Sequence, residues 1–298
     1  MLTSTRDLLD TARRNSYAIG AFNVYNLEGV KAVINAAEAT LSPAMLQLHP
    51  SALKYGKSPL VALCLEAARA AIVPVSVHLD HSTSATDIRV ALATGMRSIM
   101  ADGSPLTYEQ NREFTRDMTA LCHEYGAMVE AEIGRISGTE DGLTIAEKEA
   151  KMTDPDQAVA FVQFTQVDAL AVTIGNVHGE YKSPPRLDFA RLARIRDLID
   201  LPLVLHGASG LPETMISQSI QLGVCKFNVN TEVRQAYLQT LKVELGGDRT
   251  RDLLDITSTA IAAMQTVITE KLHLFGSVGK AHLHDTPYAR SLAAYEQG

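Results

Sequence analysis

Short apolar segments alternate with helical patterns along most of this chain, and this alternation constrains the fold more than any other feature. Eight segments have the character of strands, at 17–22, 44–48, 74–79, 97–101, 128–132, 169–174, 203–205 and 224–229. The first six match short buried strands in apolar run length and β-branched content. Helical patterns lie between the strands, at 27–39, 59–70, 84–94, 108–125, 156–163, 188–197 and 213–222. Strands separated by helices form βαβ units and a parallel sheet.

Eight such units in about 230 residues are the size of a (β/α)8 barrel. We therefore predict a TIM barrel in a single α/β domain over residues 1–298, with extra C-terminal helices at 231–245 and 251–275. A doubly wound open sheet is the structural alternative. Its first strand would be followed by a glycine-rich phosphate turn, whereas this chain has AFNVYNLEG there, without GxGxxG.

Charge and composition exclude several functional classes. The net charge is −7 and the Lys and Arg residues are scattered, which argues against a nucleic-acid partner. No apolar run approaches the roughly 20 residues of a membrane span. The first 16 residues form a charged amphipathic pattern and not a signal peptide. The three cysteines form no CxxC pair, which is typical of reduced, buried thiols in a cytoplasmic protein.

One segment, 134–151, breaks the rhythm because it is long, polar and rich in glycine. A loop of this kind after a barrel strand is usually either a functional lid or a segment without fixed structure. We predict a mobile active-site loop.

Three histidines each follow an apolar strand-like run: His81, His178 and His206. One histidine at a strand end is more often a hydrogen-bonded structural residue than a ligand. In a parallel barrel, however, all strand C-termini open onto one face, so three imidazoles can meet there and leave a fourth metal position open. We therefore predict a catalytic zinc site. His49, at the end of the second strand, faces the same mouth and is a candidate substrate contact, whereas His78 fits a supporting or core position.

The neighbouring motifs suggest what such a metal would act on. HGASG follows the seventh strand and KFNVNTE the eighth, where barrels often bind phosphate. A phosphate beside a carbonyl-polarising metal suggests a phosphorylated ketone, and a divalent cation stabilises the enediolate formed by losing a proton alpha to the carbonyl. Asp80 is the first candidate for proton transfer, or alternatively orients the imidazole of His81. Glu140 or Asp141 could be a second acid/base group, or a solvated loop charge.

These motifs resemble those of the class II, zinc-dependent ketose-bisphosphate aldolases. The resemblance covers almost the whole chain, because AFNVYNLE, HLDHS, SIMADGS, EAEIGRISGTEDG, GNVHGEYK, PLVLHGASGLP and KFNVNTE occur in the family's order and approximate spacing. Several anchors in one order are far more specific than any single motif. The resemblance implies a (β/α)8 barrel, a homodimer or homotetramer, and reversible cleavage of a phosphorylated sugar to dihydroxyacetone phosphate (DHAP) and an aldehyde.

The resemblance also implies roles for individual residues. His81, His178 and His206 would bind the catalytic Zn²⁺, and Asp102 and Glu132 match acidic positions that can hold a second or alternative metal position. Asp80 would be the proton donor to the aldehyde oxygen, and Glu140 the lid residue for proton transfer at the enediolate. A monovalent cation, Na⁺ or K⁺, would lie near the phosphate. The residues expected to hold DHAP or other parts of the substrate are Asn23, His49, Gly179, Gly207, Ala208, Ser209, Asn228, Asn230 and Thr231.

Three positions depart from the family pattern. Ser82 stands where glycine is usual, Asn230 where fructose-type members tend to have Asp and tagatose-type members Ala, and His49 where many members have a small residue. The DHAP half of the site thus looks intact and the aldehyde half altered, so we hypothesise a substrate other than fructose 1,6-bisphosphate.

Two alternatives remain open at this stage. One is a metal-dependent hydrolase on the same barrel, although such enzymes usually begin with an HxH pair on the first strand, and none occurs here. The other is a non-catalytic phospho-sugar-binding subunit.

Overall fold

The computed structural model contains a closed barrel of eight parallel strands in the spatial order β1-β11-β10-β8-β5-β4-β3-β2. The structure describes residues 1–298 except 141–142, 146–150, 180, 182, 247–250 and 285–298, and for 137–140 and 143–145 it describes the backbone only. The barrel strands are β1 (Ile19–Asn23), β2 (Ala44–Leu48), β3 (Val75–Ser82), β4 (Ser98–Ala101), β5 (Met128–Ile133), β8 (Ala169–Val172), β10 (Leu203–Leu205) and β11 (Val224–Val229). The predicted TIM barrel is confirmed.

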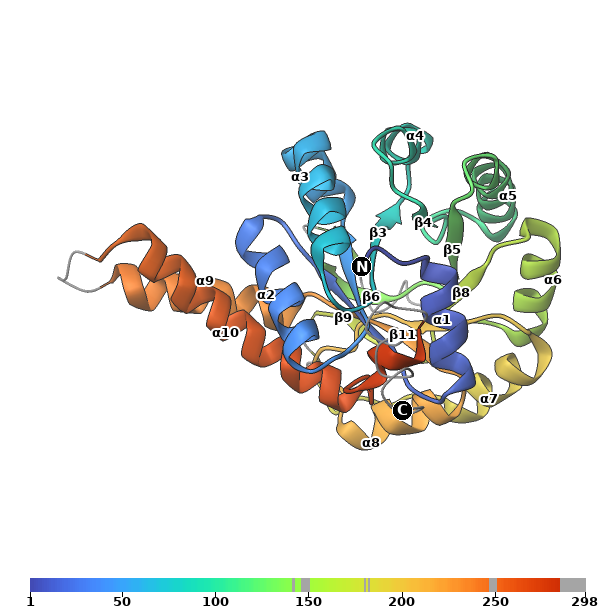
Figure 1. Ribbon diagram of the computed structural model, residues 1–298. Coiled ribbons are helices and arrows are strands. Elements are labelled where there is room, and N and C mark those ends of the chain that lie inside the picture. The colour runs from blue at the N-terminus through green and yellow to red at the C-terminus, as the bar shows by residue number, and fades with distance from the viewer. Residues whose placement is uncertain (141–142, 146–150, 180, 182, 247–250, 285–298) are drawn as a thin grey trace, which may run out of the picture.

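Helices surround this barrel (Figure 1). They are α1 (Thr5–Arg14), α2 (Leu27–Ala39), α3 (Pro50–Ala70), α4 (Ala85–Ala93), α5 (Tyr108–Glu124), α6 (Pro155–Thr165), α7 (Phe189–Leu198), α8 (Glu213–Gln221), α9 (Thr231–Leu245), α10 (Leu253–Leu274) and the 3-10 helix η2 (Lys280–Leu283). Both extra C-terminal helices, α9 and α10, are present, and they extend away from the barrel as an arm (Figure 1). Among the described residues, no helix is long and apolar enough to cross a membrane.

Two apolar clusters hold this architecture together. The larger lies between the outer faces of the strands and the surrounding helices. The smaller fills the N-terminal half of the barrel, where Met45, Met128 and Val204 pack against Leu8 and Leu9 of α1. Helix α1 thus packs apolar side chains against this end of the barrel, and the opposite, C-terminal end is where barrels of this type place their functional residues.

Helix α3 differs from the prediction because it begins at Pro50 rather than at residue 59. The backbone leaves helical geometry at Lys57, where φ is 51° and ψ is −154°. The kink arises because Pro59 lacks an N–H and its ring clashes with the carbonyl of the preceding turn. The sequence pattern therefore revealed only the second half of the helix.

The segment 134–151 contains backbone order that the sequence did not predict. Strands β6 (Ser137–Glu140) and β7 (Leu143–Ile145) form an antiparallel hairpin, and β6 also pairs in parallel with β9 (Val177–His178). The prediction for this segment was a mobile active-site loop and did not include these strands, which form because a hairpin from one βα connection pairs with the connection that follows β8. The mobility of the segment stays a prediction, and the side chain of Glu140 lies outside the described parts, as does Asp141.

Candidate metal centre and active site

The three predicted histidines meet at the C-terminal mouth of the barrel. Their ring centroids are 4.6 Å apart for His81 and His206, 5.1 Å for His81 and His178, and 6.0 Å for His178 and His206. One nitrogen of each ring lies within 4.8 Å of a nitrogen on the others. His178 and His206 follow His81 by 97 and 125 positions in the sequence, and yet the three side chains share one small volume, as the parallel barrel requires.

Each histidine reaches this point by a different route. His81 lies within β3 but has a φ of 42°, an unusual backbone conformation for a residue other than glycine and one found at functional sites. His206 directly follows β10. His178 corrects the prediction, because β8 ends at Val172 and His178 lies further on, in β9. Its position is set by pairing with the hairpin strand β6 rather than by a barrel strand.

Gly207 allows β9 to approach the end of β10. Its φ is 66°, and a Cβ atom placed there would lie 2.1 Å from the carbonyl oxygen of Val177. Two further contacts secure this corner: the side-chain amide of Asn176 donates to the carbonyl of His206 at 3.1 Å, and the hydroxyl of Tyr181 donates to the carbonyl of Gly207 at 3.0 Å. The glycine is therefore required by the packing of one histidine strand against the other.

Hydrogen bonds select the nitrogen atoms that can bind a metal. Nδ1 of His81 lies 2.8 Å from Oδ2 of Asp102, and Nε2 of His206 lies 3.0 Å from Oε1 of Glu130. The opposite nitrogens, Nε2 of His81 and Nδ1 of His206, are buried and have no hydrogen-bond partner among the described residues. A metal-ligating imidazole usually donates its other N–H to a carboxylate in this way. The residues therefore fit a bound cation.

The protonation states agree with this fit. Burial, with a smaller contribution from the charge of His81, holds the pKa of His178 well below its usual range, and burial also lowers the pKa of His206. Burial opposes protonation of His81 as well, but Asp80 and Asp102 outweigh it and raise the pKa of that ring. A cation at this point would replace the proton that these carboxylates attract, because metal binding requires neutral imidazole.

Asp80 lies beside the histidines in a buried cradle of amides. Its Oδ2 accepts from the side-chain amide of Asn23 and its Oδ1 from that of Asn228, each at 3.1 Å. Burial alone would raise the pKa of Asp80, but the positive charges of His81 and Lys226 lower it overall. The side-chain amide of Gln47 in turn donates to Oδ1 of Asn23 at 3.0 Å. The carboxylate is therefore ionised and held in one orientation.

Asp102 and Glu132 form a second candidate metal group together with His81. Burial raises the pKa of Asp102, but the hydrogen bond from His81 outweighs it and the net pKa is about 2. The pKa of Glu132 is raised well above its usual range, first by burial and then by the negative charge of Asp102. Its Oε2 also has no hydrogen-bond partner among the described residues. A cation at this second position would relieve the repulsion between the two carboxylates.

The two motifs predicted to bind phosphate lie side by side, because β10 and β11 are paired. Ala208 and Ser209 are buried after β10. Asn228 and Asn230 are buried at the end of β11, where Thr231 begins α9. The side chain of Asn230 does not cap α9 but accepts from the hydroxyl of Tyr25 at 2.9 Å. The first N–H groups of a helix have no partner within the helix, and such groups bind anions.

Two other predicted substrate residues are placed as follows. Gly179 follows His178 directly and has a φ of 83°. His49 is the N-cap of α3: its Nδ1 accepts from the backbone N–H of Ser51 at 3.2 Å and lies 2.8 Å from the hydroxyl of the same residue. His49 thus has a structural role that the sequence did not indicate, and its contact with substrate stays a prediction.

A buried charged network beneath the histidines was missed in the sequence. Oε2 of Glu130 accepts from the ammonium of Lys226 at 2.8 Å, and Oε1 contacts His206. His78 lies 3.7 Å from the same carboxylate and 2.7 Å, through Nδ1, from the hydroxyl of Ser98. Glu130 is two residues before Glu132 and Lys226 two before Asn228, so the period of two along each strand was the available signal. His78 is buried, in agreement with the expected supporting or core position.

These observations define a class: a (β/α)8-barrel protein whose C-terminal mouth brings together histidines and carboxylates that could hold a metal ion. Residues 3–280 match the family described as fructose-bisphosphate aldolase, class II. The chain belongs to this family, whose members are aldolases that generally depend on a metal.

Several solved structures of aldolases are similar to this chain. A protein from Coccidioides immitis assigned as a fructose-1,6-bisphosphate aldolase is 38% identical, with a TM-score of 0.90 over 94% of this chain and 98% of that one. The YdjI aldolase from Escherichia coli K12 is 36% identical, with a TM-score of 0.85 over 94% of this chain and 100% of that one. The fructose-bisphosphate aldolase of Campylobacter jejuni, at 20% identity, a TM-score of 0.79 and coverage of 94% and 97%, shares the fold.

Proposed function

We propose that this protein is a zinc-dependent aldolase that reversibly cleaves a phosphorylated ketose to DHAP and an aldehyde. The single observation that carries the proposal is the convergence of His81, His178 and His206 beside the ionised carboxylate of Asp80. When bound to the three histidines, Zn²⁺ would supply a Lewis acid that polarises the substrate carbonyl.

Asp80 performs the proton transfer in this proposal. In the cleavage direction its carboxylate accepts the proton of the substrate hydroxyl whose carbon becomes the aldehyde, and in condensation it returns that proton to the aldehyde oxygen. The amides of Asn23 and Asn228 orient the carboxylate for both steps. Glu140 lies on β6, the hairpin strand that pairs with β9. It would remove a proton from, and return it to, the carbon atom that is alpha to the carbonyl group of DHAP.

The loops after β10 and β11 would hold the phosphate of DHAP. Gly207 to Ser209 offer backbone N–H groups without bulky side chains, and Thr231 offers the N-terminus of a 15-residue helix. Asn23, Gly179, Asn228 and Asn230 would contribute the remaining contacts. A monovalent cation, Na⁺ or K⁺, would lie beside the phosphate, and Asp102 with Glu132 would hold an alternative position of the catalytic metal.

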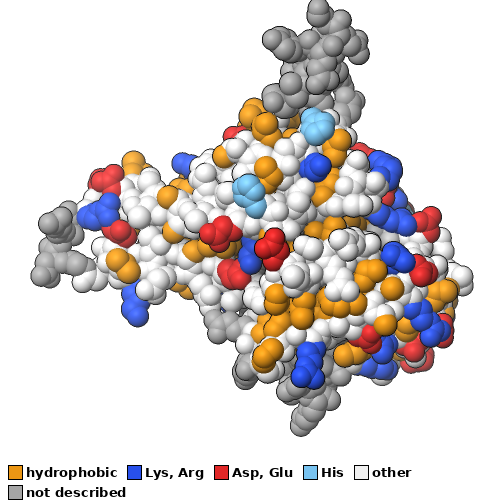
Figure 2. Space-filling view, turned by 90° about the horizontal axis from the view of Figure 1, so that it is seen from below, with side chains coloured by type: hydrophobic (Ala, Val, Ile, Leu, Met, Phe, Trp, Pro, Cys, Tyr) orange, Lys and Arg blue, Asp and Glu red, His pale blue; other side chains and the backbone are white. Residues whose placement is uncertain are grey.

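We also propose a homodimer or homotetramer that acts in the cytoplasm on a phosphorylated sugar. Five large apolar side chains on the α9–α10 arm are 56–73% exposed: Leu238, Val243, Leu245, Leu253 and Leu254. Figure 2 shows hydrophobic side chains among charged ones on this arm. A second copy of the chain is the occupant that the family membership favours for such a surface. Three free, buried thiols support a reducing compartment.

The experiment that tests this function follows hydrogen exchange at C3 of DHAP by NMR in D2O, and requires no knowledge of the aldehyde. We expect exchange with the zinc-loaded protein, none after chelation, and none with His206→Ala. Asp80→Asn is the matched control, because it removes the proton-transfer group for the aldehyde and should retain zinc binding and exchange. If zinc and DHAP both bind and no exchange occurs, the proposal is wrong.

The substrate hypothesis has its own test. Asn230 and His49 alter the half of the site expected to receive the aldehyde, so we propose a ketose phosphate other than fructose 1,6-bisphosphate. Cleavage of that sugar with a kcat/KM of about 10⁴ M⁻¹s⁻¹ or more, the usual range for a physiological substrate, would contradict this hypothesis.

A further inference from the structure

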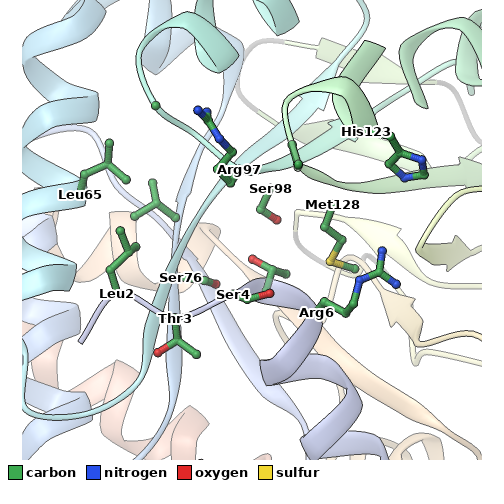
Figure 3. Close-up of a pocket in the computed structure, with 15 residues that line it drawn as sticks. Leu2, Thr3, Ser4, Arg6, Leu65, Ser76, Arg97, Ser98, His123 and Met128 are labelled. Carbon is green, nitrogen blue, oxygen red and sulfur yellow. The ribbon is translucent and has the colours of Figure 1, made fainter. Parts of the chain in front are cut away.

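A second cavity lies at the opposite end of the barrel from the metal centre (Figure 3). Its volume is about 440 Å³, and its walls come from the N-terminus of α1 and the first residues of β3, β4 and β5. Ser76 lines it, five residues before His81 on β3. At about 3.3 Å per residue, this separation is roughly 16 Å, so the cavity is distinct from the site described above.

Basic side chains line part of this cavity. Its lining includes Arg6, Arg97 and His123 and contains no Asp or Glu. Among the described residues, the guanidinium of Arg97 donates to two backbone carbonyls, those of Leu92 at 3.1 Å and Met96 at 2.8 Å, and forms no ion pair. Arg6 and His123 both contact Asp168, which lies outside the lining. Of the three basic side chains, Arg97 is therefore the one whose charge no described carboxylate offsets.

The N-terminus of α1 supplies hydrogen-bond donors to the same space. Ser4 is the N-cap residue of this 10-residue helix, and its side chain makes no capping hydrogen bond. No acceptor for the backbone N–H groups of Thr5 and Arg6 is found among the described residues. The first N–H groups of a helix, together with its dipole, favour an anion at this end.

Two buried hydroxyls provide an independent indication of a ligand. Ser76, which is 1% exposed, and Thr5, which is 5% exposed, are among the residues that line the cavity, and neither Oγ of Ser76 nor Oγ1 of Thr5 has a hydrogen-bond partner among the described residues. Buried hydroxyls in native proteins are normally paired. The hydroxyl of Ser98, by contrast, is already engaged by His78. Figure 3 shows Ser4, Ser76 and Ser98 around one space.

From this arrangement we infer that the cavity binds a small phosphate monoester. Helix N–H groups and hydroxyls approach from several directions, and Arg97 adds positive charge at the rim, an arrangement that suits the tetrahedral oxygens of phosphate better than a planar carboxylate. The rest of the wall is apolar and includes Leu2, Leu65 and Met128, which would contact the carbon chain of the ester. The site is separate from the proposed phosphate position at the metal centre and does not depend on it.

Methyl NMR on the intact, zinc-loaded protein with ¹³C-labelled methionine methyl groups tests this inference. Met128 lines the cavity, whereas Met100 reports on the metal centre because its sulfur accepts from the backbone N–H of His81 at 3.4 Å. Glycerol 3-phosphate is the probe, inorganic phosphate and acetate are the comparison ligands, and matched NaCl controls for ionic strength. We expect a saturable shift of Met128 with glycerol 3-phosphate, a weaker one with inorganic phosphate and none with acetate.

Variants assign the response to the cavity. Arg97→Gln keeps a donor for the two carbonyls but removes the charge, and we expect it to weaken the Met128 response about tenfold or more. Arg89→Gln removes an exposed charge from α4 outside the cavity and should leave the response unchanged. Ser76→Ala should weaken binding without altering the Met100 titration. A Met128 shift that does not saturate, that acetate reproduces, or that Arg97→Gln leaves intact would overturn the inference.

Discussion

The buried ion pair beneath the metal centre gives the most demanding prediction. Lys226→Met removes an ammonium group that is 0% exposed and leaves Glu130, itself 2% exposed, without its partner at 2.8 Å. Burial raises the pKa of Glu130, but Lys226 outweighs this effect and lowers it. Loss of one partner of a buried ion pair typically costs about 3–5 kcal/mol, because the other charge is left uncompensated. We therefore expect a loss of this size in the free energy of unfolding.

The double variant Glu130→Gln with Lys226→Met separates charge from packing. Glutamine keeps an oxygen that can accept from Nε2 of His206 and carries no charge, so we expect the double variant to be less destabilised than Lys226→Met alone. Urea unfolding of the chelated protein measures both, with m-values compared to exclude a change in the denatured state. Arg69→Met is the control, because Arg69 forms an exposed pair with Glu66 and should contribute only about 0–1 kcal/mol.

Two results would refute this reasoning. A loss below about 1 kcal/mol for Lys226→Met would mean that water or relaxation compensates the charge as it does at a surface. The second result is a loss of unfolding free energy in the double variant that equals the sum of the losses in Glu130→Gln and Lys226→Met. It would mean that Glu130 and Lys226 do not act as a pair, since residues in one buried network normally show non-additive effects.

Three further predictions follow from the same structure. Gly207→Ala should lower zinc affinity at least about tenfold, measured by competition with a chromophoric chelator, because the new methyl group displaces β9 and thus His178; unchanged affinity would contradict this. Burial lowers the pKa of His284 to about 4, below the 6.5 of the unfolded chain, so stability should fall as pH decreases from 6.5 toward 4. His284→Gln should make the urea midpoint less sensitive to pH in that window, and an equal sensitivity would rule the explanation out. Leu254→Asp on the arm should give a smaller species in light scattering, whereas an unchanged mass would exclude this surface as the subunit contact.

The barrel and the end at which its site lies could be predicted from the sequence, because both depend on patterns within short segments of the chain. Each strand and helix has a periodicity set by its own residues, and parallel βαβ units place every strand end at one mouth. His81 and His206 could therefore be assigned from the run that precedes each of them. Asp80 and the motifs after β10 and β11 followed by the same argument.

Contacts between segments distant in the sequence decided the rest. His178 is placed by pairing between β9 and β6, and no local pattern records that pairing. The hydrogen bonds of Asp102 and Glu130 select which nitrogen of His81 and His206 remains available for a metal. The sequence by itself thus determined the residue types and the end of the barrel where they gather. The tertiary structure determined their orientation and protonation, because both depend on neighbours that only the closed barrel brings together.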